Sequence, residues 1–227
     1  MTAPRAVLWD MDGTLIDSEE FHWLAWRDTM ALEGHPITRE QFLASFGQRN
    51  DSIVPQLLRT AATPDRVERI SNAKEQLYRD LVRQKGISPL PGVTAWLQRL
   101  REQGWLQAIA SAAPRANLDV ILAALGANQF FQGLVSAEDV HRGKPDPEVF
   151  VTAAAKLGVP PHSCIVVEDA AAGIEGAHRA GMHSIGVSRN GKHLSADIVV
   201  QSLDHLDPQA FDTLLNRTAK GNLNAHS

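Results

Sequence analysis

The feature that most constrains this chain is a regular alternation between short apolar runs and amphipathic segments that end at glycine. Strands that alternate with helices in this order favour an α/β fold, a Rossmann-like parallel sheet with helices on both faces. The runs resemble strands buried on both faces and cover residues 6–9, 106–110, 134–135, 164–167, 184–187 and 198–200. The expected helix ends are marked by Gly104, Gly126, Gly158 and Gly181.

One long interval, residues 17–86, contains helical patterns and no convincing strand. Its clearest helix begins where Thr63 can serve as N-cap and Pro64 occupies the first helical position. About seventy residues are enough for a small all-α unit. We therefore expect an inserted α-helical cap domain over residues 17–89 and a Rossmann-like core over residues 1–16 and 90–227, with a return hinge in the segment ISPLPG.

The composition speaks against several classes of protein. Of 227 residues, 44% are apolar and 21% are charged, and the net charge of −4 does not suit a surface for nucleic acid or for an acidic membrane. No apolar run approaches the ~18 residues of a membrane span, and the first residues lack the pattern of a signal peptide. The single cysteine, Cys164, cannot form an intrachain disulfide. We expect a cytoplasmic monomer or weak homodimer.

Acidic side chains follow two of the predicted strands. Asp10 and Asp12 come after the first run, and Glu168 and Asp169 come after the fourth. Ligands bind beyond the carboxyl ends of strands in an open parallel sheet, so we expect these four carboxylates to meet in one crevice. Crowded carboxylates repel one another unless a cation neutralises them, and Mg²⁺ prefers oxygen ligands and often lies between carboxylates and a phosphate. The sequence therefore predicts a Mg²⁺ site.

Such a cluster is suited to phosphoryl transfer. One aspartate can attack phosphorus while a second, held nearby by the sharp DGT turn, protonates the leaving group. Lys144, in the loop RGKPDP, adds a positive charge, and the hydroxyl of Ser111, after the second run, can donate to a phosphoryl oxygen. We expect the backbone N–H groups of Gly13 and Thr14 to complete this electrostatic cradle.

Four segments resemble, in order and spacing, the motifs of the haloacid dehalogenase-like (HAD) phosphotransferases: DMDGTL, the serine of AIASAAP, GKPDP and IVVEDAAAGIEGAHRAG. The resemblance implies that Asp10 is the nucleophile that forms an aspartyl-phosphate. It also implies that Asp12 is the general acid and base and a Mg²⁺ ligand through its backbone carbonyl. By the same resemblance, the phosphoryl group is bound by Ser111 and Lys144, and Mg²⁺ also by Asp10, Glu168 and Asp169.

The helical interval resembles the β-phosphoglucomutase and sugar-phosphatase branch of this family. The resemblance lies in the segments DSEEFHWLAW, GQRNDSI and AKEQLY. It implies that three residues of the cap face the substrate, namely His22, Arg49 and Lys74. We also expect Ala112, next to Ser111, to contact the substrate.

Departures from the mutase pattern bear on the choice between a mutase and a phosphatase. The mutases carry a serine and an asparagine that touch the distal phosphate, whereas this chain has Ala113 and Arg115 at those places, and Thr14 replaces the usual valine. We therefore expect a Mg²⁺-dependent phosphatase that hydrolyses a small phosphorylated metabolite, a sugar or polyol phosphate. The alternatives are a β-phosphoglucomutase-like isomerase and a catalytically silent phosphate-binding protein.

Overall fold

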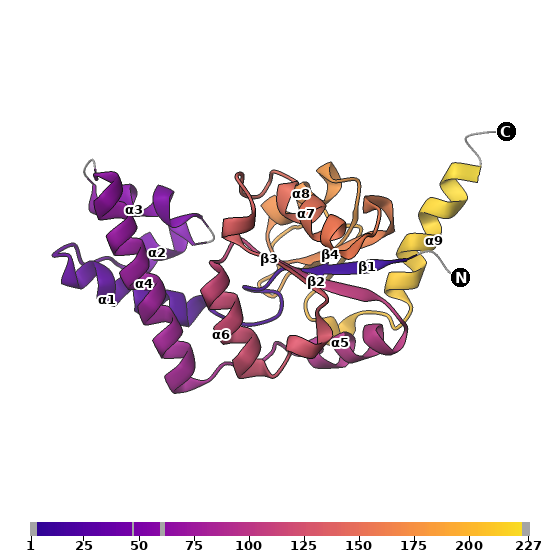
Figure 1. The fold of residues 1–227 in the computed structure, drawn as a ribbon, viewed down its shortest axis with the longest axis horizontal. Coiled ribbons are helices and arrows are strands. Elements are labelled where there is room, and N and C mark those ends of the chain that lie inside the picture. The colour runs from indigo at the N-terminus through magenta and orange to yellow at the C-terminus, as the bar shows by residue number, and fades with distance from the viewer. Residues whose placement is uncertain (1–3, 47, 60–61, 224–227) are drawn as a thin grey trace.

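The centre of the molecule is a parallel β-sheet. The computed structural model describes residues 4–46, 48–59 and 62–223. Within these residues six strands pair in the order β3-β2-β1-β4-β5-β6 (Figure 1). The Rossmann-like parallel sheet expected from the sequence is thereby confirmed, and each predicted run agrees with a strand to within one residue. The strands are β1 (Ala6–Trp9), β2 (Leu106–Ala110), β3 (Gly133–Val135), β4 (Cys164–Glu168), β5 (His183–Val187) and β6 (Ile198–Val200).

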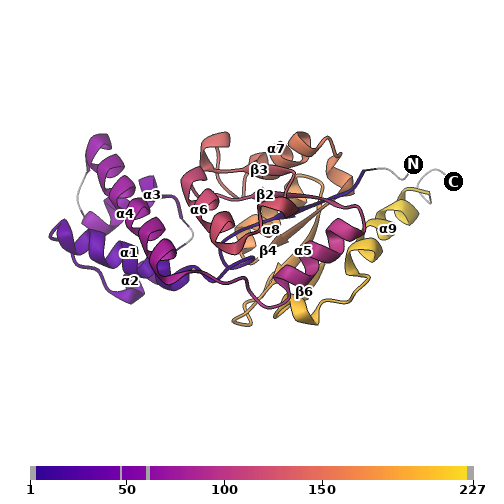
Figure 2. The same cartoon turned by 60° about the horizontal axis from the view of Figure 1, so that its bottom comes forward.

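Helices cover both faces of the sheet (Figures 1 and 2). Successive strand residues point to opposite faces, so β1 contributes Val7 and Trp9 to one hydrophobic core and Ala6 and Leu8 to another. The first core also contains side chains of α5, α6 and α9, and the second contains side chains of α7 and α8. These helices are α5 (Val93–Glu102), α6 (Arg115–Leu125), α7 (Glu148–Leu157), α8 (Ala171–Arg179) and α9 (Ala210–Leu223).

A group of helices forms a second lobe beside the sheet, at the end of the molecule opposite both termini (Figure 1). This helical lobe has a hydrophobic core of its own that includes Trp26, Phe42 and Ile70. In the described part of the interval it contains α1 (Glu19–Leu32), α2 (Arg39–Ser45), α3 (Asn50–Leu58) and α4 (Pro64–Lys85).

The chain passes between the two lobes twice, and the two passages lie side by side. The N–H of Leu90 donates to the carbonyl of Leu15 at 2.9 Å, and Ile16 forms an isolated antiparallel bridge with Pro89. Both connections are therefore held to each other at the base of the helical lobe. The proposed domain boundaries, after residues 16 and 89, stay a prediction.

Helix ends follow local signals in the sequence. Thr63 caps α4 by accepting a hydrogen bond from the N–H of Arg66, and Gly126 ends α6 with a φ of 59°, in the left-handed region that favours glycine. Helix α2 was not among the predicted helical segments, although Thr38 and Gln41 form a capping box at its start. No helix in the described ranges is long and apolar enough to cross a membrane.

We expect Phe211→Ala to lower the free energy of unfolding by about 3–5 kcal/mol, because it removes a large buried ring and leaves a cavity. Phe211 anchors α9 to the sheet, is 2% exposed, and its ring centroid lies 5.1 Å from that of Trp96 and 5.8 Å from that of Trp105. Urea unfolding followed by circular dichroism measures the loss. The control is Leu32→Ala, whose side chain is 88% exposed and whose removal should change stability by no more than about 0.5 kcal/mol.

Candidate active site

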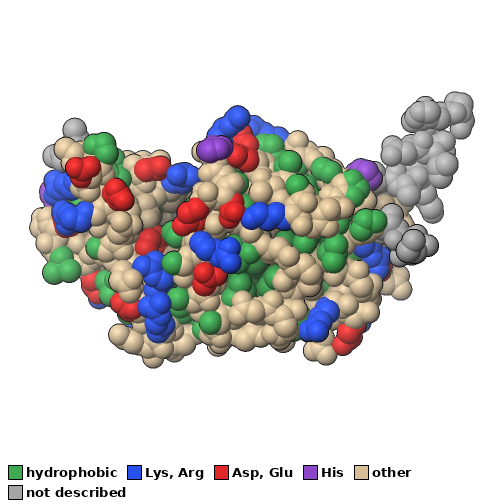
Figure 3. All heavy atoms as spheres, in the orientation of Figure 1, with side chains coloured by type: hydrophobic (Ala, Val, Ile, Leu, Met, Phe, Trp, Pro, Cys, Tyr) green, Lys and Arg blue, Asp and Glu red, His purple; other side chains and the backbone are tan. Residues whose placement is uncertain are grey.

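The candidate site lies at the carboxyl ends of three neighbouring strands. Asp10 and Asp12 follow β1, Ser111 follows β2, and Asp169 follows Glu168, the last residue of β4. The register places Trp9 beside both Ile109 and Val167, so the three strands end at nearly the same level. Figure 3 shows that the surface is hollowed between the helical lobe and the sheet, with charged side chains of both signs around the hollow.

Lys144 forms the centre of a buried charge cluster. Its Nζ donates to Asp10 Oδ1 at 2.5 Å and to Glu168 Oε1 at 2.6 Å. Carboxylate oxygens of Asp10, Glu168 and Asp169 all lie within 4.8 Å of one another. Three carboxylates share one ammonium, which leaves two negative charges uncompensated within a few ångströms.

The crowding changes the proton affinities of the cluster. Burial, together with the charges of Glu168 and Asp169, raises the pKa of Asp10 well above its usual value, although Lys144 works against this shift. Burial and the Glu168 carboxylate raise the pKa of Asp169 to about 7. Burial acts to lower the pKa of Lys144, but the attraction of Asp10 and Glu168 outweighs it and the pKa is raised. The cluster therefore has too little positive charge to balance its carboxylates, and these oxygen donors suit a hard divalent cation.

Glu168 also organises the start of helix α8. Its Oε2 accepts a hydrogen bond from the N–H of Ala170 at 2.7 Å, while its Oε1 contacts Lys144. Gly173 gives this carboxylate its space, because a Cβ at that position would lie 1.9 Å from Glu168 Oε1. Glu168 thus belongs to the candidate metal group and at the same time holds the turn that leads into α8.

Asp12 occupies a different environment from Asp10. Its Oδ1 accepts a hydrogen bond from the Ser18 hydroxyl, and His22 Nε2 lies 3.5 Å from the same oxygen. Burial acts to raise the pKa of Asp12, but the contacts with His22 and Ser18 outweigh it and the pKa is lowered. Ser18 stands at the N-cap position of α1 without capping it, because its hydroxyl is directed to Asp12 instead. Its part in the site was missed, since the pattern before α1 also fits an ordinary cap.

The helical lobe supplies His22 and Lys74. Lys74 Nζ donates to His22 Nδ1 at 2.9 Å. An ammonium has no acceptor, so Nδ1 must be the unprotonated nitrogen of a neutral ring, and Nε2 then carries the hydrogen toward Asp12. The ring also stacks on Tyr78, with centroids 4.1 Å apart and an interplanar angle of 14°. The fold thus brings together three predicted site residues that are distant in the sequence.

Position 13 must be a glycine, because the site leaves no room there for a side chain. It has a φ of 84°, and a Cβ there would lie 2.1 Å from Asp169 Oδ2. Its N–H donates to the carbonyl of Ile16 at 2.8 Å. This differs from the expectation that the N–H of Gly13 is free for a phosphoryl group, because the tight DGT turn uses that donor itself. Thr14 is fully buried, and among the described residues its hydroxyl has no hydrogen-bond partner.

The remaining predicted site residues follow β2 or precede α3. Ser111 is 2% exposed, and its Oγ accepts a hydrogen bond from the N–H of Ala113 at 3.1 Å, while Ala112 is exposed. Arg49 precedes α3 and pairs with Asp51 at 3.3 Å. Arg49 also lies beside the loop that carries Lys144, since its Cδ is 3.6 Å from where a Cβ of Gly143 would be.

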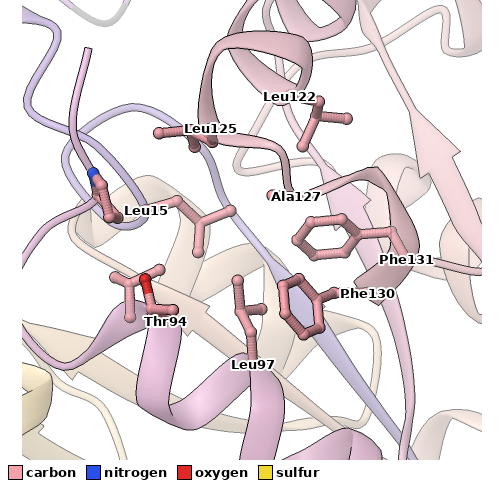
Figure 4. Close-up of a pocket in the computed structure, with 10 residues that line it drawn as sticks. Leu15, Thr94, Leu97, Leu122, Leu125, Ala127, Phe130 and Phe131 are labelled. Carbon is pink, nitrogen blue, oxygen red and sulfur yellow. The ribbon is translucent and has the colours of Figure 1, made fainter.

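A second hollow lies beneath the connections between the lobes, between α5 and α6 (Figure 4). Its lining is apolar and includes Leu15, Leu97 and Phe130, with Thr94 as the one residue with a polar side chain among the described residues around it. Such a lining offers a phosphate no charge and no side-chain donor besides the Thr94 hydroxyl. The candidate active site is therefore the charged crevice at the strand ends.

Comparison with known proteins places the chain in a family. Residues 4–181 match the model of the family described as haloacid dehalogenase-like hydrolase, and the chain belongs to that family. It is 32% identical to the β-phosphoglucomutase of Bacillus subtilis (strain 168), over 89% of this chain and 91% of that protein. It is 34% identical to hexitol phosphatase B of Escherichia coli (strain K12), over 91% of this chain and 97% of that protein.

A solved structure supports the same assignment. The fold matches that of a β-phosphoglucomutase from Clostridium difficile with a TM-score of 0.84 and 25% identity, over 95% of this chain and 99% of that one. The similar proteins thus include a sugar phosphomutase and a phosphatase, and the resemblance to this branch that the sequence motifs indicated is confirmed.

We expect Asp169→Asn to stabilise the metal-free protein and at the same time to weaken its stabilisation by Mg²⁺. Without Mg²⁺ the variant should melt at a higher temperature than the parent protein, because it loses a crowded charge. Mg²⁺ at about 100 times its dissociation constant should stabilise the parent by about 2.7 kcal/mol, and the variant much less, because a ligand is missing. Thermal melts with and without Mg²⁺ measure both effects, with Asp119→Asn on the exposed face of α6 as control. An unchanged Mg²⁺ response in Asp169→Asn would exclude this carboxylate as a ligand.

Proposed function

We propose that the protein is a Mg²⁺-dependent phosphatase that hydrolyses a sugar or polyol phosphate through an aspartyl-phosphate. The observation that carries the proposal is the separation of two aspartates that are two positions apart in the sequence. Asp10 lies in the charge cluster with Lys144, and Asp12 lies outside it against Ser18 and His22. Two carboxylates with different partners can take two roles in one reaction, and Asp12, whose pKa is lowered in the free protein, must take up a proton when the substrate binds before it acts as the acid.

The first step forms the aspartyl-phosphate. A carboxylate oxygen of Asp10 attacks phosphorus, the bond from phosphorus to the substrate oxygen breaks, and Asp12 gives that oxygen a proton. In the second step the Asp12 carboxylate takes a proton from water, the water oxygen attacks phosphorus, and the bond between phosphorus and the Asp10 oxygen breaks. Inorganic phosphate then leaves, and both aspartates return to their starting states.

Lys144 and Ser111 are assigned to the transferring phosphoryl group. Lys144 already neutralises Asp10, and it can donate to a phosphoryl oxygen as negative charge develops there. Mg²⁺ held by Asp10, Glu168, Asp169 and the backbone carbonyl of Asp12 would supply the missing positive charge and polarise the phosphoryl oxygens. The fit rests on the three side chains whose oxygens already lie within 4.8 Å of one another.

Hydrolysis is favoured over isomerisation by the residues where the mutases bind a second phosphate. A mutase must hold a bisphosphate, so it needs a second anion site. Arg115 offers a cation in this stretch, but its guanidinium pairs with Asp119 at 2.9 Å and its side chain is 55% exposed. Arg49 is paired with Asp51. These contacts support a phosphatase, whereas the identities of 34% to a hexitol phosphatase and 32% to a β-phosphoglucomutase do not separate the two reactions. The cytoplasmic location and the monomeric or weakly dimeric state stay predictions.

We expect Asp10→Asn to lose turnover by about 10³-fold or more while it keeps the fold, because an amide does not attack phosphorus as a carboxylate does. Phosphate release from p-nitrophenyl phosphate with Mg²⁺ measures the loss, and circular dichroism checks the fold. Asp28→Asn, an exposed change on α1, is the matched control and should leave turnover unchanged. Substantial turnover by Asp10→Asn would refute the covalent mechanism.

A phosphorus NMR time course distinguishes the three candidate functions. The sample contains β-glucose 1-phosphate, Mg²⁺ and a catalytic amount of glucose 1,6-bisphosphate, and a parallel sample contains sorbitol 6-phosphate. We expect free phosphate as the main product and little glucose 6-phosphate. Near-stoichiometric glucose 6-phosphate would identify a mutase. Phosphate binding without release from any ester, p-nitrophenyl phosphate included, would identify a silent phosphate-binding protein.

A further inference from the structure

A buried polar network joins the helical lobe to the core where α4 packs against α6. Its centre is Glu75 of α4, which is 7% exposed. Glu75 Oε1 accepts hydrogen bonds from Lys74 Nζ at 2.9 Å and from Asn50 Nδ2 at 2.8 Å. Glu75 Oε2 accepts one from Nδ2 of Asn117, a residue of α6 that is 1% exposed, at 2.6 Å. One carboxylate therefore has partners in both lobes.

Asn117 can contact both Glu75 and Arg79 in only one of the two orientations of its side-chain amide. Its Oδ1 accepts a hydrogen bond from Arg79 at 3.0 Å, while its Nδ2 donates to Glu75. A flipped amide would put an oxygen against the carboxylate and an amino group against the guanidinium, and both contacts would be repulsive. Asn117 is thus a core residue whose two polar atoms match two oppositely charged side chains of α4.

The same network leads to the acid and base of the proposed reaction. Lys74, held by Glu75 Oε1, donates to His22 Nδ1 at 2.9 Å, and His22 Nε2 lies 3.5 Å from Asp12 Oδ1. A continuous series of polar contacts therefore runs from α6 of the core, through the helical lobe, and back to the end of β1.

We propose that Glu75 is a positioning residue and that Asn117 is its docking partner, so that the orientation of His22 toward Asp12 depends on the contact between α4 and α6. The proposal rests on the proposed function, in which Asp12 transfers the proton. When Asn117 holds one oxygen of Glu75, the other oxygen fixes Lys74, and Lys74 fixes the tautomer of His22. When α4 separates from α6, this order is lost.

Charge and burial support this role. Burial acts to raise the pKa of Glu75, but Lys74, His22 and the two amides outweigh it and the pKa is lowered, so the carboxylate is ionised at neutral pH. Burial lowers the pKa of Lys74, and Glu75 opposes that shift. A buried ion pair of this kind contributes little stability by itself, but it holds a geometry because neither charge tolerates the loss of its partner.

The test exchanges the acidic and the amide side chain between position 75 in the helical lobe and position 117 in the core. Asn117→Asp keeps the size of the side chain and its contact with Arg79, but it places a carboxylate against Glu75. Glu75→Gln keeps the shape and removes the charge. In the double variant the new amide can donate to the new carboxylate, so the contact between the lobes is restored with the same total charge. Glu68→Gln, an exposed change on α4 of the same chemistry as Glu75→Gln, is the matched control.

The readout is kcat/KM for two esters that differ in their need for an acid. Sorbitol 6-phosphate has a poor leaving group that must be protonated, whereas p-nitrophenolate leaves without a proton. We expect each single variant to lower kcat/KM for sorbitol 6-phosphate about tenfold and to leave the value for p-nitrophenyl phosphate within about threefold. The double variant should recover most of the loss, and Glu68→Gln should behave as the parent protein.

Three results would overturn the proposal. They are single variants that behave as the parent, equal losses for both esters, and a double variant whose loss is the product of the two single losses. Thermal melts of all variants separate a folding defect from a positioning defect. A parent protein that releases phosphate from neither ester would overturn the proposed function as well, whereas release from both with any of the three results would overturn the positioning role alone.

Discussion

The ion pairs of Lys144 with Asp10 and Glu168 are the interactions on which the rest of the site depends. Three carboxylates this close together, of which Asp10 and Glu168 are buried, would repel one another, and one ammonium compensates only part of their charge. The sheet makes the contact possible, because β1 and β4 are adjacent and end at the same level. Gly13 and Gly173 leave room for the carboxylates of Asp169 and Glu168. The shortage of positive charge is what makes a divalent cation the natural complement of this site.

Contacts with the helical lobe make the surroundings of Asp12 different from those of Asp10. Asp10 and Asp12 are two positions apart, yet Asp12 is turned from the cluster toward Ser18 and His22. Lys74 reaches the same region from α4 and determines which nitrogen of His22 carries the hydrogen. The core therefore provides the charged cluster, and the lobe provides the surroundings of Asp12, the proposed acid and base. Chemistry that needs both depends on how the two lobes are held together.

The family relationship limits the number of candidate reactions, and local contacts favour one of them. The similar proteins include a β-phosphoglucomutase and a hexitol phosphatase. What distinguishes the two reactions is whether a second phosphate is held away from that site. Arg115 and Arg49 are the cations considered for that task. Arg115 pairs with Asp119 on α6, and Arg49, just before α3, pairs with Asp51 of that helix. This pairing is the physical basis for favouring hydrolysis.

The sequence by itself determined the strands, the order of the sheet-and-helix units and the residues that crowd the strand ends, because these follow from local periodicity and from the rule that parallel strands carry sites at their carboxyl ends. It did not determine the partners of Ser18, the use of the Gly13 N–H within its own turn, or the contact of Glu75 with Asn117. Those two residues are 42 positions apart. Only the packing of α4 on α6 brings them together, and no local pattern encodes which of many buried or exposed polar side chains will meet across such a contact.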